Sequence, residues 1–207
     1  MALALCLGAC TGADAPSDAV FTAAVQNYLA RHGDLCLAKN HWPIDVTQHE
    51  IDVGARNARQ MPVLERLGLV DSSVAEVDVD DEGTLHHMKV RRFALTDAGR
   101  KYYVMRDVHG NGNGGGGAAL QGDFCAAHLS LDRVVGWKLN PAGEGRPQRA
   151  VVSYTYKIDP APWTADAEAQ RVFPVVAGVV RGAGTAQLQE SFRQTKDGWV
   201  PADLEGS

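Results

Sequence analysis

The chain has 207 residues, of which 45% are hydrophobic and 22% are charged, and its formal net charge is −5 at pH 7. This composition is typical of a globular protein with one or two domains, and it excludes a disordered chain, a collagen-like repeat and a small disulfide-rich scaffold. No apolar run approaches the roughly 18–20 residues of a membrane-spanning helix. The acidic balance argues against nucleic acid as a partner.

The first predicted element is a helix over residues 18–31, with Ser17 as its N-cap and Gly33 as its C-terminal stop. The apolar residues that would share one face of this helix are Val20, Phe21, Ala24, Val25, Tyr28 and Leu29. Because such a face packs against a core, we expect this helix to have a structural role.

Local signals along the rest of the first half predict two short helices and a hairpin. Thr47 and Glu50 have the spacing of a capping box, which opens a helix that runs toward Arg56. Residues 61–69 predict a second helix with Pro62 in its first turn. The remaining expected elements are an extended segment at 42–46, strands at 74–79 and 85–95 around the acidic turn 80–83, and a capped turn of helix at 96–103.

The second half of the chain shows the alternation of antiparallel β-structure. The expected elements are strands at 129–139, 150–158, 188–195 and 198–200, and a helix at 162–173 that Pro174 stops. This order predicts a small β-β-α-β-β domain. Its core, between sheet and helix, would be formed by Trp137, Tyr154, Tyr156, Trp163, Phe173, Phe192 and Trp199.

A Gly-rich stretch at 109–123 separates the two patterns and is expected to be a loop. It has no cationic residue at a helix entry and no strand-to-helix context, so we do not expect it to bind phosphates. The expected fold class is α+β. A winged-helix-like domain would occupy residues 18–108, and the β-β-α-β-β domain would occupy residues 124–207.

The winged-helix expectation rests on two phrases, LERLGLV at 64–70 and ALTDAGR at 94–100. They resemble the end of the recognition helix and the far side of the wing in bacterial transcription regulators. The resemblance implies an alternative function, a DNA-binding regulator, which requires that Cys10 carries no lipid. The charges disfavour it, because Arg56, Arg59 and Arg66 are offset by Glu50, Asp52 and Glu65.

The tetrapeptide Leu7-Gly8-Ala9-Cys10 resembles the lipobox of bacterial lipoproteins. The resemblance implies that residues 1–9 are the remnant of a signal peptide, that the thiol of Cys10 carries the lipid, and that residues 10–17 form a polar tether. A signal peptide has a basic n-region, whereas the first Lys or Arg here is Arg31, so we expect the natural start to lie upstream of Met1. The protein would be anchored in the bacterial cell envelope, at the outer membrane, and would face the periplasm.

Most of the chain also resembles a group of uncharacterised proteobacterial lipoproteins. The phrases that carry this resemblance are GDLCLA, ALTDAGRKYY, FCAAH, VSYTYKI and KDGW. The resemblance to this group carries over no known activity, substrate or catalytic residue, so it implies nothing about a reaction.

Within the lipoprotein interpretation, the four cysteines have separate fates. Cys6 leaves with the signal peptide and Cys10 is lipidated, which leaves Cys36 and Cys125 in an oxidising compartment, where they would pair as a disulfide. Two alternatives stay open. They are a pair of buried free thiols in a cytosolic protein, and a catalytic cysteine with a histidine such as His128.

No motif in the sequence assigns a reaction. We expect no catalytic residue, no metal site and no cofactor, because the histidines are scattered and the serines lack a nucleophile elbow. The leading hypothesis is a non-enzymatic binding or interaction module, held at the membrane by its N-terminal lipid, whose partner is an envelope protein or a small ligand. The alternatives are the winged-helix regulator and a periplasmic hydrolase without a recognised motif.

Overall fold

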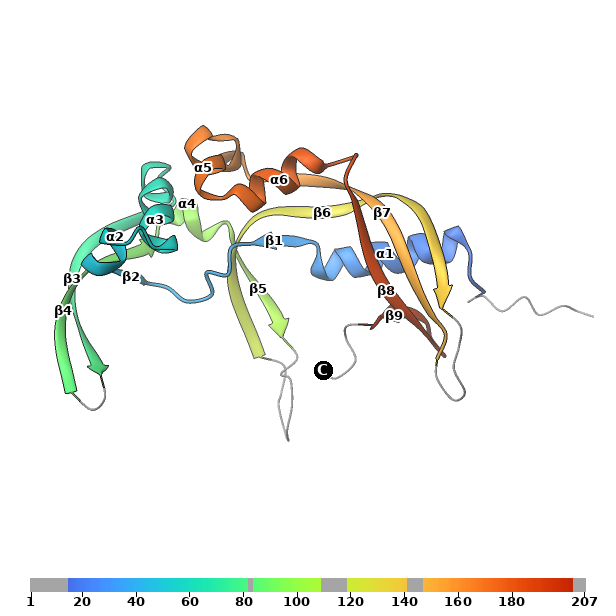
Figure 1. Cartoon of the computed structure of the whole chain (residues 1–207), viewed down its shortest axis with the longest axis horizontal. Coiled ribbons are helices and arrows are strands. Elements are labelled where there is room, and N and C mark those ends of the chain that lie inside the picture. Colours follow the sequence, from blue (N-terminus) through green and yellow to red (C-terminus); the bar gives the residue numbers. More distant parts are fainter. Residues whose placement is uncertain (1–14, 82–83, 109–118, 141–146, 203–207) are drawn as a thin grey trace, which may run out of the picture. The chain divides into compact units, whose positions relative to one another are not determined.

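The structure is a computed structural model of the chain, and it describes residues 15–81, 84–108, 119–140 and 147–202 (Figure 1). Helices and antiparallel strands are both abundant, which confirms the α+β class. The chain forms two compact units, each built from separate segments. Of the described residues, unit 1 contains 15–32, 130–140, 147–157 and 184–202, and unit 2 contains 33–81, 84–108, 119–129 and 158–183.

These units differ from the domains expected at 18–108 and 124–207. Helix α1, Asp18–His32, belongs to unit 1, whereas residues 158–183 belong to unit 2. Of the expected loop, residues 109–118 lie outside the described part, and residues 119–123 form the start of β6, Ala119–Asn140. The difference arises because strands far apart in the chain pair with one another, which local patterns do not reveal.

Unit 1 packs α1 against β9, Gly198–Pro201. Ser17 caps α1 as predicted, because its Oγ accepts a hydrogen bond from the N–H of Val20 at 3.3 Å. Phe21 is fully buried, and its ring centroid lies 5.1 Å from that of Trp137 and 4.9 Å from that of Trp199. The predicted helix and its buried face are therefore confirmed.

Unit 2 contains a three-stranded sheet of order β2-β4-β3. Its strands are β2, Ile44–Thr47, β3, Val70–Asp81, and β4, Thr84–Leu95. The predicted hairpin is confirmed, because β3 and β4 pair in continuous antiparallel register. The far end of this hairpin extends away from the helices that precede it in the chain (Figure 1).

Two helices lie between β2 and β3. Helix α2, Gln48–Asp52, begins with the predicted capping box, in which Thr47 Oγ1 accepts from Glu50 N at 3.2 Å. Contrary to expectation, α2 does not run toward Arg56, and α3, Arg56–Arg66, begins before residue 61 with Pro62 in its interior. The sequence misplaced this start because the N-cap, Ala55, makes no side-chain capping bond that a pattern could reveal.

A second sheet has the order β1-β6-β7-β8-β9, and β5 also pairs with β6. The remaining strands are β1, Asp34–Cys36, β5, Tyr103–Val108, β7, Arg149–Pro160, and β8, Gln187–Thr195. Strands β7, β8 and β9 match their predictions to within two residues. Strands β1 and β5 were not predicted. Strand β1 pairs antiparallel with β6, which lies far along the chain, and β5 pairs antiparallel with β6 as the next strand in the sequence.

The helix expected at 162–173 is divided into two elements, and a further helix that was not predicted follows it. In chain order they are the 3₁₀-helix η1, Pro162–Ala165, and helices α5, Ala167–Val172, and α6, Pro174–Gly182. Asp166 caps α5 by accepting from the N–H groups of Glu168 and Ala169, both at 2.9 Å. Pro174 was expected to stop a helix, but it occupies the first turn of α6, where its missing N–H costs no helical bond.

The core of unit 2 is centred on Phe124 of β6, which is fully buried. Its ring centroid lies 6.1 Å from those of Trp42 and Tyr102 and 5.9 Å from that of Trp163. The expected aromatic core is thus divided between the units. Of the seven predicted core residues, Trp163 and Phe173 belong to unit 2, and the other five, Trp137, Tyr154, Tyr156, Phe192 and Trp199, belong to unit 1.

Gly99, in the short helix α4, Asp97–Arg100, closely approaches the backbone of Leu69. A Cβ atom at this position would lie 1.9 Å from the carbonyl oxygen of Leu69. We expect Gly99→Ala to lower the free energy of unfolding by about 3 kcal/mol, because backbone must move to make room. Equilibrium unfolding in urea measures this change.

Gly178→Ala is the matched control, because a Cβ atom there meets nothing within 4 Å. Alanine favours a helix interior over glycine by about 1 kcal/mol, so this variant should be at least as stable as the wild type. A Gly99→Ala variant with wild-type stability would contradict the close approach.

Candidate functional site

The candidate site in unit 2 is built on the pairing of β1 with β6. The register places Cys36 opposite Cys125, and their sulfur atoms lie 2.08 Å apart, at disulfide distance. The sequence predicted that these two cysteines come together. The other predicted site residue, Cys10, lies outside the described residues.

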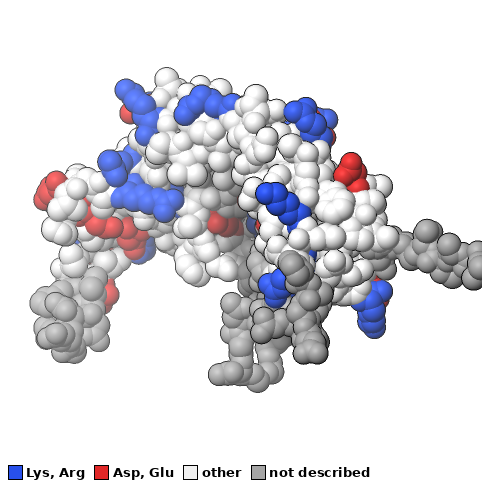
Figure 2. Space-filling model, turned by 45° about the vertical axis from the view of Figure 1, so that its right-hand side comes forward, with Lys and Arg blue, Asp and Glu red and all other residues white. Residues whose placement is uncertain are grey.

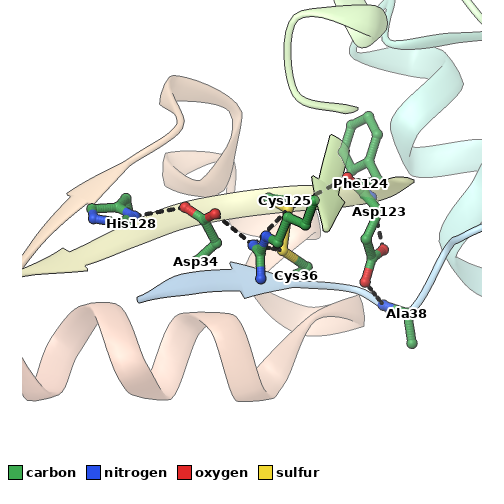
Figure 3. Close-up of polar contacts among 8 residues, drawn as sticks. Asp34, Cys36, Ala38, Asp123, Phe124, Cys125 and His128 are labelled. Carbon is green, nitrogen blue, oxygen red and sulfur yellow. Dashed lines mark hydrogen bonds and ion pairs between the residues drawn. A yellow bond between two sulfur atoms is a disulfide. The ribbon is translucent and has the colours of Figure 1, made fainter. Parts of the chain in front are cut away.

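A chain of polar contacts leads from this sulfur pair to His128 (Figure 3). Nη2 of Arg106 lies 2.9 Å from Sγ of Cys36 and 2.6 Å from Oδ2 of Asp34. The other carboxylate oxygen of Asp34 lies 2.6 Å from Nδ1 of His128. Because a carboxylate only accepts, His128 donates through Nδ1 and presents Nε2 to another partner.

The sequence contains a signal for this cluster that the sequence analysis missed. The pattern Asp-apolar-Cys occurs twice, at 34–36 and at 123–125. Residues two apart on a strand point to the same face, so Asp34 was a candidate neighbour of Cys36. The partners Arg106 and His128 carry no comparable signal, since strand register brings them to Asp34.

Asp123 fixes the backbone that follows β1. Its carboxylate accepts hydrogen bonds from the N–H groups of Ala38 at 3.1 Å and Phe124 at 2.7 Å (Figure 3). It also accepts from the N–H of Lys39 at 2.7 Å. Ala38 has a φ of 55°, in the left-handed region that costs a non-glycine residue roughly 1–2 kcal/mol. The bonds from Asp123 stabilise this conformation and thereby position Lys39.

Lys39 is a buried cation, with 4% of its surface exposed, and its Nζ donates to Oδ1 of Asn57 at 2.8 Å. Burial and, second, the charge of Arg56 lower the pKa of Lys39 to about 8, while Asp123 acts in the opposite direction. A cavity of about 310 Å³ borders this side chain, lined by residues 38–41, Ile44 and Asn57. An amine with this pKa is partly neutral at mildly alkaline pH, so it can accept a hydrogen bond or react as a nucleophile.

Asp34 and His128 also line a cavity of about 290 Å³. Its wall includes Lys101, Cys125 and residues 159–162. This volume lies at the lower end of the range for small-molecule sites. The polar cluster is therefore open to a ligand of modest size.

Within the described residues, no three His, Cys, Asp or Glu side chains are placed to hold a metal ion together. Each helix of the described part is too short or too polar to cross a membrane. Comparison with protein-family models, curated proteins and solved structures found no match. The function must therefore be inferred from the site itself.

The lowered pKa of Lys39 predicts a pH-dependent stability. Between about pH 8 and pH 10.5, the unfolded chain binds a proton that the native state has released, so the free energy of unfolding rises with pH. We expect Lys39 to contribute a rise of about 2 kcal/mol across this window. Urea unfolding of the wild type and of Lys39→Met at pH 7.5, 9 and 10.5 measures it, because the free energy of unfolding of the wild type should rise by this amount relative to that of the variant.

Lys101→Met is the control, because Lys101 is exposed on the same unit. The difference in the free energy of unfolding between this variant and the wild type should stay constant over this pH range. If the difference in the free energy of unfolding between the wild type and Lys39→Met also stayed constant with pH, the lowered pKa of Lys39 would be contradicted.

Proposed function

We propose that this chain is a lipid-anchored envelope protein that acts as a non-enzymatic binding module in the periplasm. Its lipid would be carried by Cys10, and residues 10–17 would tether the folded part to the outer membrane. Its partner would be an envelope protein or a small ligand. The observation that carries the proposal is the placement of Cys36 and Cys125 at disulfide distance.

This observation bears on the compartment because structural disulfides persist in oxidising surroundings and are rare in the cytosol. A bridge between Cys36 and Cys125 closes a separation of 89 residues. Such a bridge stabilises by about 4–5 kcal/mol in the chain-entropy model. With these two cysteines paired, Cys10 of the lipobox is free to take the lipid.

The finer fold assignment, a winged-helix-like domain expected over residues 18–108, is also part of this proposal, and the elements within 44–95 are the ones that support it. The element order β2-α2-α3-β3-β4 and the sheet order β2-β4-β3 support it. This order is the one observation that favours a DNA-binding regulator as the second candidate. A DNA reader would need the basic side chains of α3 and of the hairpin to be free for phosphates.

Several of those side chains are engaged within unit 2, at the end of α3 and on the hairpin. Arg66, on α3, pairs with Asp166 at 2.7 Å and Glu168 at 3.1 Å. On the hairpin, Arg92 binds both carboxylate oxygens of Asp45 at 2.7 Å, which holds the pKa of Asp45 below its ordinary value. Figure 2 shows Lys and Arg in small separate groups on the face in view, several beside Asp or Glu. This arrangement of charges favours a structural role for the paired arginines over contact with DNA phosphates.

We expect the chain, expressed behind a lipoprotein signal peptide that ends at Ala9 in a Gram-negative host, to incorporate a clickable palmitate analogue. Cys10→Ala should abolish the label, because the thiol is the site of acylation. Cys6→Ala should keep it, because Cys6 precedes the cleavage site. In-gel fluorescence of membrane fractions measures the label, and an unlabelled wild type would contradict the anchor and favour the regulator.

For protein from the same envelope fraction, unfolded in denaturant so that burial no longer protects a thiol, we expect Cys36 and Cys125 to resist alkylation by iodoacetamide until a reductant is added. Peptide mass spectrometry measures the modification of each cysteine. Cys36→Ser should make Cys125 reactive without reductant, because its partner is gone. Two alkylated cysteines in unreduced wild-type protein would contradict the pairing.

A further inference from the structure

Of the charged side chains that the structure describes, Lys39 is the only one that is buried. Removing an ammonium group from water is costly unless a carboxylate and further hydrogen bonds compensate it. Within the described residues, Nζ of Lys39 forms no ion pair, and its one hydrogen bond goes to the neutral Oδ1 of Asn57 at 2.8 Å. The protein therefore buries an amine to which the described part of the chain supplies no directly bound carboxylate.

The bonding of this Nζ favours the neutral amine. An ammonium group has three N–H donors, and the described part of the chain offers them one acceptor. A neutral amine donates the same bond, keeps a lone pair and leaves fewer donors unpaired. Burial and then the positive charge of Arg56 lower the pKa of Lys39 to about 8, although Asp123 opposes them. A fraction of the amine is therefore a competent nucleophile near neutral pH.

Four side-chain bonds hold the segment 37–40, which carries this amine. Arg56 donates to the carbonyl oxygen at the start of the segment at 3.0 Å, and the hydroxyl of Tyr103 donates to the one at its end at 2.6 Å. Between them, Asp123 accepts from two N–H groups and supports the left-handed φ of Ala38. Backbone held in an unfavourable conformation by its surroundings is typical of functional sites, where it orients a side chain before a ligand arrives.

The amine also has space beside it for a ligand. Lys39 and Asn57, the two residues joined by the bond from Nζ, both line the cavity of about 310 Å³. Ile44 adds an apolar side chain to the lining, and His41 adds an exposed imidazole. None of the described lining residues is acidic, so none pairs with the amine. The volume suits a small organic molecule.

Resting on the binding function proposed above, we propose that Lys39 binds a small aldehyde or ketone covalently, as an imine on Nζ. A carbonyl compound needs a neutral, accessible amine beside a cavity, and Lys39 supplies these features together. A small anion would need the ammonium form, which the bonding of Nζ disfavours. The site would thus hold its ligand by a covalent bond that water can reverse.

The reaction needs no oxidant or reductant. The lone pair of Nζ attacks the carbonyl carbon, and the electron pair of the C=O bond moves to oxygen. A proton passes from nitrogen to that oxygen to give a carbinolamine, which loses one water molecule as the C=N bond forms. His41 lines the same cavity, and an imidazole is suited to carry the proton to the departing hydroxyl.

The test uses the full chain without its lipid, butanal, and sodium cyanoborohydride, which reduces an imine to a stable secondary amine. Peptide mass spectrometry measures the butyl group on each lysine at pH 7.5. We expect Lys39 to be labelled at least about tenfold faster than Lys138 and Lys196, which are exposed, because an amine in water is almost fully protonated at this pH. The rate at Lys39 should saturate with butanal, because the aldehyde occupies the cavity before it reacts.

Asn57→Asp tests the role of the neutral partner. This isosteric change places a carboxylate beside Nζ and favours the ammonium form, so labelling of Lys39 should fall about tenfold at pH 7.5. The loss should shrink at pH 9, whereas a disrupted cavity would keep it. Asn27→Asp is the matched control, because Asn27 is exposed on α1 of unit 1, and labelling of Lys39 should stay as in the wild type.

Three results would overturn the proposal: labelling of Lys39 no faster than that of the exposed lysines, a rate that rises linearly with butanal up to its solubility, or equal rates in Asn57→Asp and Asn27→Asp. The linear rate would indicate a reactive amine without a binding site. None of these results touches the lipid label on Cys10, which is read in cells. Failure of the Lys39 site and failure of the anchor are therefore separate outcomes.

Discussion

The antiparallel pairing of β1 with β6 holds the candidate site together. The N–H of Leu37 donates to the carbonyl oxygen of Phe124 at 2.9 Å, and Asp123 binds the backbone of the next two residues. Phe124 is fully buried in the aromatic core, while its neighbour Cys125 meets the sulfur of Cys36. Because successive side chains on a strand alternate between faces, one tripeptide anchors the core, fixes a loop and forms the sulfur pair.

Ion pairs decide which cations of unit 2 remain available to a partner. Exposed pairs stabilise a fold by only about 0.2–1 kcal/mol each, so the bonds of Arg66 and Arg92 matter more for the charges they neutralise. Arg66 lies on the same helix as Arg56, but its guanidinium is bound to Asp166 and Glu168, whereas that of Arg56 donates to a carbonyl oxygen. The start of α3 thus keeps its positive charge, and the end of α3 does not.

Local signals predicted many elements of this fold, and long-range strand pairing determines the features that they did not predict. Ser17, Thr47 and Thr96 each cap a helix in the structure, because a cap is made by residues within one turn of each other. The contact between Asp34 and His128 spans 94 positions and depends on the register of two strands, one of them only three residues long. Of the candidate site, the sequence predicted the cysteine pair through the lipobox. It could not predict the contact of Lys39 with Asn57, because the start of α3 has no capping residue.

Strand β1 contributes to two features: the sulfur pair, whose redox state depends on the cellular compartment, and the placement of the segment 37–40, which follows it directly. Cys36 belongs to the sulfur pair, and Lys39 belongs to the segment 37–40. A disulfide at Cys36 would restrict the motion of that segment, and a site that is ordered before binding loses less conformational entropy when a ligand arrives. The backbone bond from Leu37 to Phe124 and the bonds to Asp123 do not depend on the sulfur atoms. Reduction would therefore loosen the segment without dismantling it, and an oxidising compartment is where Lys39 is best ordered for binding.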